Sequence, residues 1–135
     1  MKRRVVVTGL GVVTPLASKV DELFERLLAG ESGVYLLRLF DTSEFKVKFA
    51  GDVRDWNPSD YIDRKEVKRI DRFTQFALVA GADAVADSGL DFSKEQAFRC
   101  GAILGSGIGG LHEIETQMER PLKKWPDPVS AMAIT

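Results

Sequence analysis

The segment from Cys100 to Glu113 contains the chain's only cysteine, its only histidine and a cluster of four glycines between positions 105 and 110. These residue types allow three kinds of site. A cysteine beside a histidine can act as a nucleophile, and a glycine-rich turn between a strand and a helix can bind the phosphates of a dinucleotide. Glycines also let two backbones, or a backbone and an acyl chain, approach closely. A plain strand-to-helix turn is the alternative without chemistry.

A catalytic pair of Cys100 and His112 would need the thiol next to the imidazole, with a third group orienting the base. Cys100 begins an apolar segment that we predict to be a strand, whereas His112 follows the glycine cluster in the next predicted helix. The length of the strand would separate the two side chains. We therefore expect Cys100 to be a small buried thiol and His112 to be a surface or loop histidine.

Three of the glycines, Gly105, Gly107 and Gly110, match the dinucleotide-binding pattern G-x-G-x-x-G. The dinucleotide-binding fold also needs a following strand with an acidic residue about twenty positions on, which holds the ribose. The corresponding range contains Pro126-Asp-Pro128, and two prolines oppose a buried strand. Dinucleotide binding is therefore disfavoured.

In the third interpretation the glycines allow a close approach and hold out one apolar side chain, that of Ile108.

The composition excludes several classes of function. A chain of 135 residues with 44% hydrophobic residues supports one domain with a modest core, or a piece of one. Nineteen basic and twenty acidic residues give a net charge of -1. The chain therefore lacks the overall positive charge that nonspecific nucleic-acid binding needs. A single cysteine and the lack of CxxC spacing suggest neither a disulfide nor zinc, so we expect a reducing, cytoplasmic setting. No apolar run suits a signal peptide or a membrane-spanning helix.

Alternating strand and helix patterns predict an α/β fold with a largely parallel sheet. Buried strands are expected over residues 4–8 and 99–104, and an edge strand over 46–53. Helices are expected over 20–28, from 70 to the closing turn Ser88-Gly-Leu90, and over 111–122. Ser18 is the expected N-cap of the first helix, and Gly30 its end. Pro121 is expected to begin an irregular segment.

The long middle helix contains many small residues between Ala80 and Ala86. Small side chains let a helix approach another element closely. We therefore expect this helix to be central and buried.

Ordered motifs along the whole chain resemble one protein family. The motifs are Arg3-Arg-Val-Val-Val-Thr-Gly-Leu-Gly11, Leu27-Leu-Ala-Gly-Glu-Ser-Gly33, Phe40-Asp-Thr-Ser43, Lys48-Phe-Ala-Gly51, Asp71-Arg-Phe73 with Ala80, and Gly105-Ser-Gly-Ile-Gly-Gly-Leu111. Together they resemble the N-terminal portion of bacterial β-ketoacyl-acyl carrier protein synthases of type II, which are condensing enzymes of the thiolase fold. The resemblance covers essentially all of residues 1–135, which would be about the first third of a family member.

The resemblance implies a five-layered α/β/α/β/α body made of two similar halves, with this chain supplying most of the first half of a homodimeric enzyme. It implies an acyltransferase that condenses an acyl-enzyme with malonyl-acyl carrier protein in fatty acid elongation. The implied partner is acyl carrier protein, loaded with acyl or malonyl groups. The resemblance implies no cofactor, no binding to nucleic acid and no association with a membrane. In the family a cysteine takes the acyl group and two histidines assist. No residue of this chain matches these three, so residues 1–135 alone are expected to be inactive.

The resemblance also assigns residues of the acyl-chain pocket. Ile108 matches an apolar gate at the mouth of that pocket. Ile134, between Ala133 and Thr135, matches a stretch near the dimer interface and the partner's pocket.

A docking patch for the carrier protein is implied at Lys65, Lys68 and Arg69. Their i, i+3, i+4 spacing would place all three charges on one face of a helix. An ordinary solvated helix face is the alternative, because most charge runs are just that. Asp127 and Pro128 stand where the family often has basic docking residues, which is a departure from its pattern.

Two other classes of function stay open. The chain could be a truncated fragment that acts only as an assembly module or a carrier-protein-binding module, and a continuation carrying the nucleophile would argue against this. It could also be a small nucleotide-binding α/β protein, in which case nicotinamide cofactors should quench the fluorescence of Trp56 or Trp125.

Overall fold

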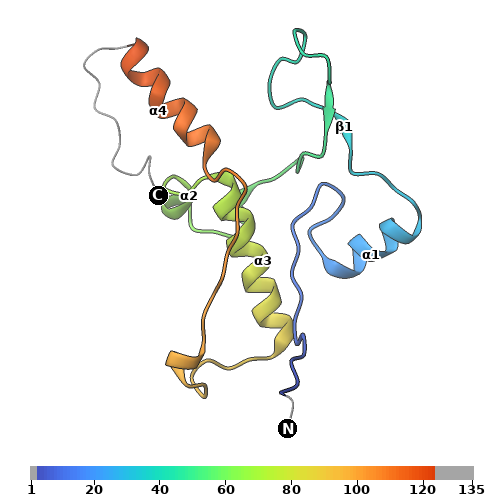
Figure 1. Cartoon of the computed structure of the whole chain (residues 1–135), viewed down its shortest axis with the longest axis vertical. Helices are drawn as coiled ribbons and strands as arrows, with labels where there is room; N and C mark the ends of the chain where they lie inside the picture. Colours follow the sequence, from blue (N-terminus) through green and yellow to red (C-terminus); the bar gives the residue numbers. More distant parts are fainter. Residues whose placement is uncertain (1–2, 124–135) are drawn as a thin grey trace.

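The computed structural model describes residues 3–123, and the side chains of residues 3–119. Helix α3 lies at the centre of the structure, with α1, the strands and α4 arranged around it (Figure 1). In chain order the elements are α1 (Val20–Leu28), β1 (Tyr35–Leu36), β2 (Phe49–Ala50), η1 (Pro58–Asp60), α2 (Arg64–Val67), α3 (Arg72–Ser88), η2 (Ala97–Arg99) and α4 (Leu111–Lys123).

Helix α3 begins and ends close to where its sequence predicts. Asp71 precedes the helix with an extended backbone, and its carboxylate accepts a hydrogen bond from the backbone N–H of Arg72. Gly89 follows the helix in the left-handed conformation, with φ of 65°. Glycine adopts that conformation without the steric cost of a Cβ atom, so the helix ends there.

The N-terminal segment lies backbone to backbone against α3. A Cβ atom on Gly11 would be 2.7 Å from the backbone nitrogen of Ala84, and one on Gly9 would overlap the helix backbone in the same way. Between these glycines, the backbone N–H of Leu10 donates a hydrogen bond to Asp87 Oδ2 at 2.9 Å. The close approach predicted for the small residues of this helix is confirmed at this contact.

Burial along α3 is lower than the sequence predicts. Gln75 and Val79 are its buried residues, and Ala17 is the only other buried hydrophobic residue in the part of the chain that the structure describes. The N-terminal segment covers one side of the helix, and Leu78 and Val85 are exposed elsewhere on it. The helix is central, as predicted, but the prediction that it is buried is wrong for these residues.

The structure confirms the predicted span of helix α1, but the N-cap residue differs from the predicted one. Lys19, rather than Ser18, is the N-cap residue, and no side chain caps the helix. Gly30 follows the helix with φ of 73°. The backbone N–H of Glu31 donates to the carbonyl oxygen of Arg26 at 3.0 Å, which completes a glycine-based C-terminal cap.

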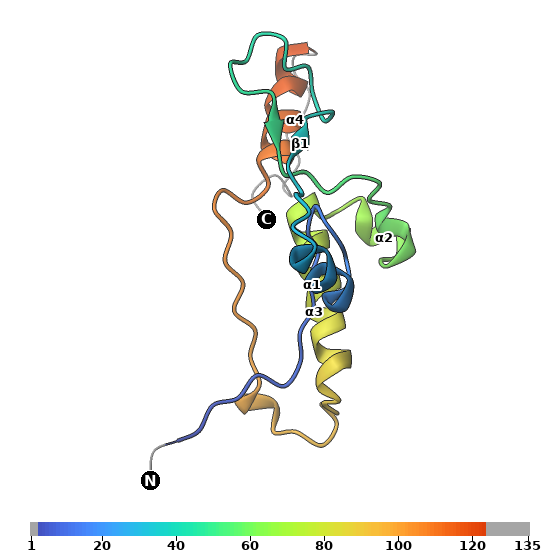
Figure 2. The ribbon, with the colours of Figure 1, turned by 90° about the vertical axis from the view of Figure 1, so that its right-hand side faces the viewer.

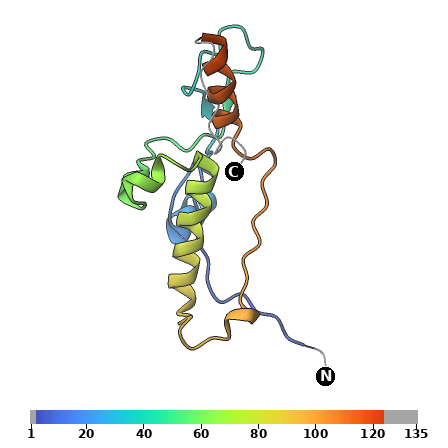
Figure 3. The ribbon, with the colours of Figure 1, turned by 90° about the vertical axis from the view of Figure 1, so that its left-hand side faces the viewer.

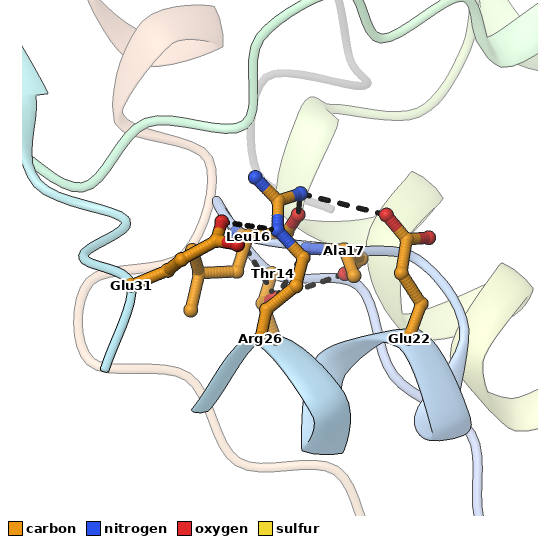
Figure 4. A network of polar contacts seen from close by, with 6 residues as sticks. All are labelled: Thr14, Leu16, Ala17, Glu22, Arg26 and Glu31. Carbon is orange, nitrogen blue, oxygen red and sulfur yellow. Dashed lines mark hydrogen bonds and ion pairs between the residues drawn. The ribbon is translucent and has the colours of Figure 1, made fainter. Parts of the chain in front are cut away.

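The side chain of Arg26 joins α1 to the loop before it (Figure 4). Its guanidinium donates hydrogen bonds to the carbonyl oxygen of Leu16 and to the carboxylate of Glu31, the latter at 2.7 Å. Within the loop, the hydroxyl of Thr14 donates to the carbonyl oxygen of Ala17 at 2.8 Å. These contacts fix how the chain turns from the N-terminal segment into α1.

Strands β1 and β2 form a short antiparallel pair in which Tyr35 lies opposite Ala50. The edge strand predicted over residues 46–53 is confirmed only at its centre. Arg54 stabilises the pair, because its guanidinium lies 4.5 Å from the centre of the Tyr35 ring and forms an ion pair with Asp52 at 2.9 Å.

The two buried strands predicted over residues 4–8 and 99–104 do not form among residues 3–123. Both segments are extended and unpaired, and residues 97–99 form η2 instead. Val5 is 93% exposed and Ile103 is fully exposed. A strand is held by hydrogen bonds to a neighbouring strand, and these segments do not meet each other. The largely parallel sheet predicted from them is therefore wrong for the described residues.

The two extended segments nevertheless run in the same direction along α3. Each leads from the C-terminal end of α3 toward its N-terminal end (Figures 1 and 2). The opposite side view shows the second segment returning past α3 to reach α4 (Figure 3). This is the relative direction that strands of a parallel sheet would have.

Candidate functional site

The loop from Gly105 to Gly110 presents Ile108 from a tight turn. The hydroxyl oxygen of Ser106 accepts a hydrogen bond from the backbone N–H of Gly109 at 2.9 Å. Gly109 has φ of 81°, so the turn requires a glycine at that position. Ile108 is 74% exposed. The loop therefore holds out a single apolar side chain, as its sequence predicts.

The start of α4 is held by a residue from the start of α3. Asp71 Oδ2 accepts a hydrogen bond from the backbone N–H of Glu113 at 3.2 Å. A Cβ atom on Gly110 would lie 2.8 Å from the same carboxylate oxygen. The absence of a side chain at Gly110 therefore lets the carboxylate reach the first turn of α4.

Cys100 and His112 do not form a catalytic pair in this structure. Cys100 directly follows η2, whereas His112 lies in the first turn of α4, and the extended segment 101–110 runs between them (Figure 1). Both residues are exposed. The prediction of a surface histidine is confirmed. The prediction of a buried thiol is wrong, because the strand that would bury Cys100 does not form here.

The basic residues proposed for docking lie at and just beyond helix α2. Asp63 caps this four-residue helix by accepting a hydrogen bond from the backbone N–H of Lys65 at 2.8 Å. Lys68 is the C-cap residue, and Arg69 lies in the following turn, where its backbone N–H bonds to the carbonyl oxygen of Glu66.

The expectation of three charges on one continuous helix is therefore wrong, since α2 ends at Val67. Lys65, Lys68 and Arg69 are all exposed. None of the three forms an ion pair with any residue from 3 to 119. Their charges are available to a partner.

An aromatic cluster connects the segment before α2 to α3. The ring of Trp56 stacks on Tyr61 with 5.1 Å between ring centres, and it meets the ring of Phe76 edge-on at 4.9 Å. Trp56 Nε1 donates a hydrogen bond to Gln75 Oε1 at 3.0 Å. Sequence reasoning assigned no role to this cluster, although a tryptophan just before a capped turn was a visible signal.

Within the described residues, no group of three or more His, Cys, Asp or Glu side chains could hold a metal ion. No helix in the same part of the chain is long and apolar enough to cross a membrane.

The family model described as "Beta-ketoacyl synthase, N-terminal domain" matches residues 2–135. The chain belongs to this β-ketoacyl synthase family. The resemblance drawn from the ordered motifs is thereby confirmed. The family match does not support the interpretation of the glycine loop as a dinucleotide site.

Curated relatives agree with this assignment. The chain is 43% identical over 129 residues to a 3-oxoacyl-[acyl-carrier-protein] synthase 2 of Vibrio cholerae, covering 96% of this chain and 31% of the relative. It is 44% identical over 133 residues to the protein of the same name from Coxiella burnetii, covering 98% of this chain and 32% of the relative. The chain thus spans about a third of the length of the relatives it matches.

Solved structures show the same fold. The ishigamide ketosynthase/chain length factor superposes with a TM-score of 0.80 at 30% identity, over 99% of this chain and 34% of that one. A β-ketoacyl synthase from Burkholderia phymatum has a TM-score of 0.72 at 27% identity, over 98% and 33%. A third neighbour, at 25% identity and a TM-score of 0.52 over 71% and 25%, is described as a type II PKS acyl-carrier protein in complex with its ketosynthase. The β-ketoacyl synthase chain therefore forms part of a thiolase-like α/β fold.

Several predicted positions of this β-ketoacyl synthase chain lie outside the described residues. Ile134, the second predicted pocket residue, is one of them, with its neighbours Ala133 and Thr135. The departures at Asp127 and Pro128 are also outside that range. Helix α4 spans Leu111–Lys123, which confirms the span predicted over residues 111–122.

Proposed function

We propose that this chain is the N-terminal third of a β-ketoacyl-acyl carrier protein synthase that elongates fatty acids. The observation that carries the proposal is the family match over residues 2–135, together with relatives named 3-oxoacyl-[acyl-carrier-protein] synthase 2. The exposed apolar segments at 4–8 and 99–104 support it, because large exposed apolar surfaces mark interaction sites. In this proposal the remaining two thirds of the enzyme cover them, and the complete enzyme is a homodimer.

The proposed reaction has two steps. A cysteine thiolate attacks the thioester carbonyl of acyl-acyl carrier protein, the carrier's thiolate leaves, and an acyl-enzyme remains. Malonyl-acyl carrier protein then loses carbon dioxide, and the resulting carbanion attacks the acyl carbonyl. The enzyme thiolate leaves, so the product is a β-ketoacyl-acyl carrier protein two carbons longer.

The nucleophile and both assisting histidines are proposed to lie outside residues 1–135. Cys100 and His112 are the chain's only residues of these types, and the long loop between them keeps them apart. One histidine cannot fill two roles. This chain then provides the approach to the catalytic centre rather than the centre itself.

The carrier protein is proposed to dock on the basic patch formed by Lys65, Lys68 and Arg69. All three are exposed and lack ion pairs with the described residues. A neighbour described as an acyl-carrier protein bound to its ketosynthase supports a partner of this kind. Exposed complementary charges act mainly on the rate of association with a charged partner.

Ile108 is proposed to limit the length of the acyl chain that enters the pocket. Its β-branched side chain is stiff at χ1, and it stands on a loop of glycines that can move. Ile134 is proposed as a second residue of the same pocket.

Acylation by acyl-acyl carrier protein tests the proposed function. The protein to use is residues 1–135 joined to the remaining two thirds of the Vibrio cholerae relative, which we call the completed enzyme. Intact-mass measurement should show one added acyl group per chain, and residues 1–135 alone should gain none. A folded completed enzyme that gains no acyl group would contradict the proposal.

A further inference from the structure

The carboxylate of Asp71 accepts hydrogen bonds from backbone N–H groups at the starts of two helices that are distant in the sequence. One oxygen, Oδ1, accepts a hydrogen bond from the backbone N–H of Arg72 at the start of α3. The other, Oδ2, accepts one from the backbone N–H of Glu113 in the first turn of α4, 42 residues away. A helix leaves its first N–H groups without partners inside the helix, and a negative charge is favoured at that end.

The bond to α4 replaces a cap that the local sequence lacks. Glu113 is the third residue of α4, and its N–H is one that the side chain of the residue before a helix usually satisfies. Gly110 stands at that preceding position and has no side chain. Because a Cβ atom there would lie 2.8 Å from Oδ2 and 3.4 Å from the Cβ of Asp71, the carboxylate occupies the space that a side chain would need.

The Asp71 carboxylate lies against Gly110, which follows the exposed residue Ile108 closely in the chain. Within the glycine loop, Gly109 donates a hydrogen bond to Ser106 and accepts one from the backbone N–H of Leu111 at 3.0 Å. A Cβ atom at Gly105 or Gly107 would meet nothing within 4 Å. The loop is thus loosely packed before Ile108. On the other side of Ile108, the Asp71 carboxylate fixes the backbone that enters α4.

We propose that Asp71 is a positioning residue for acyl-chain selection. It holds the start of α4, and so fixes the direction in which Ile108 stands. This inference rests on the proposed role of Ile108 in the acyl pocket. When the bond is lost, the loop gains freedom, Ile108 moves aside more readily, and long acyl chains enter more easily relative to short ones.

The test compares kcat/KM for a long and a short acyl-acyl carrier protein in the completed enzyme. Asp71→Ala should raise the ratio of kcat/KM for the long substrate to that for the short one by about fivefold. This factor corresponds to about 1 kcal/mol, the typical contribution of one helix cap. Gly110→Ala should raise the ratio similarly, since its methyl group displaces Oδ2 while the bond to Arg72 remains. Asp71→Asn keeps a hydrogen-bond acceptor and should restore most of the original ratio.

Asp63→Ala is the matched control, because the Asp63 side chain also caps a helix, α2, and its hydrogen bond is to Lys65 rather than to the start of α4. It should leave the ratio unchanged. If Asp71→Ala and Gly110→Ala both reduce activity equally with long and short chains, the bond serves folding alone and the proposal is wrong.

A double-variant measurement separates this inference from the proposed function. In an Ile108→Ala background, Asp71→Ala should change the ratio less than about twofold, because the side chain through which it acts is gone. An undiminished effect there would overturn the inference. If Ile108→Ala changes the ratio and Asp71→Ala does not, the inference alone fails. If Ile108→Ala itself leaves the ratio unchanged, the pocket role of Ile108 is wrong and the inference falls with it.

Discussion

Gly11 and Ala84 are in such close contact that a Cβ atom on Gly11 would lie 2.7 Å from the backbone nitrogen of Ala84. The backbone of the N-terminal segment therefore lies directly against the backbone of α3. The hydrogen bond from Leu10 to Asp87 lies at the same contact. This contact sets the direction of the N-terminal segment along α3.

Gly11→Ala should destabilise the completed enzyme by about 1–3 kcal/mol, the usual cost of forcing extra atoms into a packed contact. Gly81→Ala is the control, because a Cβ atom on Gly81 meets nothing within 4 Å and alanine favours a helix interior over glycine. Thermal unfolding should show a lower midpoint for Gly11→Ala only. Equal midpoints for the two variants would mean that the N-terminal segment does not need this close approach.

Reversing two charges of the docking patch should weaken the use of acyl carrier protein. Lys65→Glu with Lys68→Glu should raise KM for the carrier protein about tenfold or more at low salt, roughly 1.4 kcal/mol. The effect should shrink as salt is added, because salt screens exposed charges. Turnover of a small acyl thioester lacking the carrier protein should change little.

Lys46→Glu with Lys48→Glu is the control for that experiment, since it makes the same change in net charge near the β1–β2 pair. It should leave KM for the carrier protein within about twofold of the original value. If the reaction with the small thioester falls as far as the reaction with the carrier protein, the charges at Lys65 and Lys68 support folding and the docking assignment is wrong.

Ile108→Phe should cut the rate with long acyl chains far more than with short ones, because added bulk at a pocket entrance restricts the longest substrates first. Val47→Phe places the same ring on an exposed residue near the β1–β2 pair and should have no such effect. The measurement is kcat/KM across a series of acyl chain lengths. A uniform loss across the series would identify Ile108 as a packing residue.

Cys100→Ala should leave condensation by the completed enzyme unchanged within about twofold, since we assign this thiol no catalytic role. Acyl-enzyme formation, followed by intact mass, should also be retained. Loss of the acyl group in this variant would overturn the assignment of the nucleophile to another part of the enzyme.

Local signals in the sequence predicted the helices well. The span of α1 followed from its apolar spacing and from Gly30, and the end of α3 followed from Gly89, because left-handed glycines mark helix ends. The N-cap of α1 was missed, since Ser18 and Lys19 are adjacent and cap positions shift by a residue or two.

Interactions between distant segments were harder to predict. The apolar runs at 4–8 and 99–104 read as buried strands, but a strand also needs a paired neighbour, which a local pattern cannot supply. The Asp71 contact with the start of α4 spans 42 residues, and the motif around Asp71 indicated only a family resemblance. Lys68 and Arg69 had helical spacing, yet α2 ends before them.

Condensation by the completed enzyme tests the central claim most directly. The measurement is the rate at which acyl- and malonyl-acyl carrier protein yield β-ketoacyl-acyl carrier protein. The account predicts product at a rate within about tenfold of that of the intact Vibrio cholerae relative, a loss of no more than about 1.4 kcal/mol in the activation barrier. A completed enzyme that folds and binds the carrier protein but forms no product would contradict the claim that this chain is the docking and pocket-forming third of a condensing enzyme.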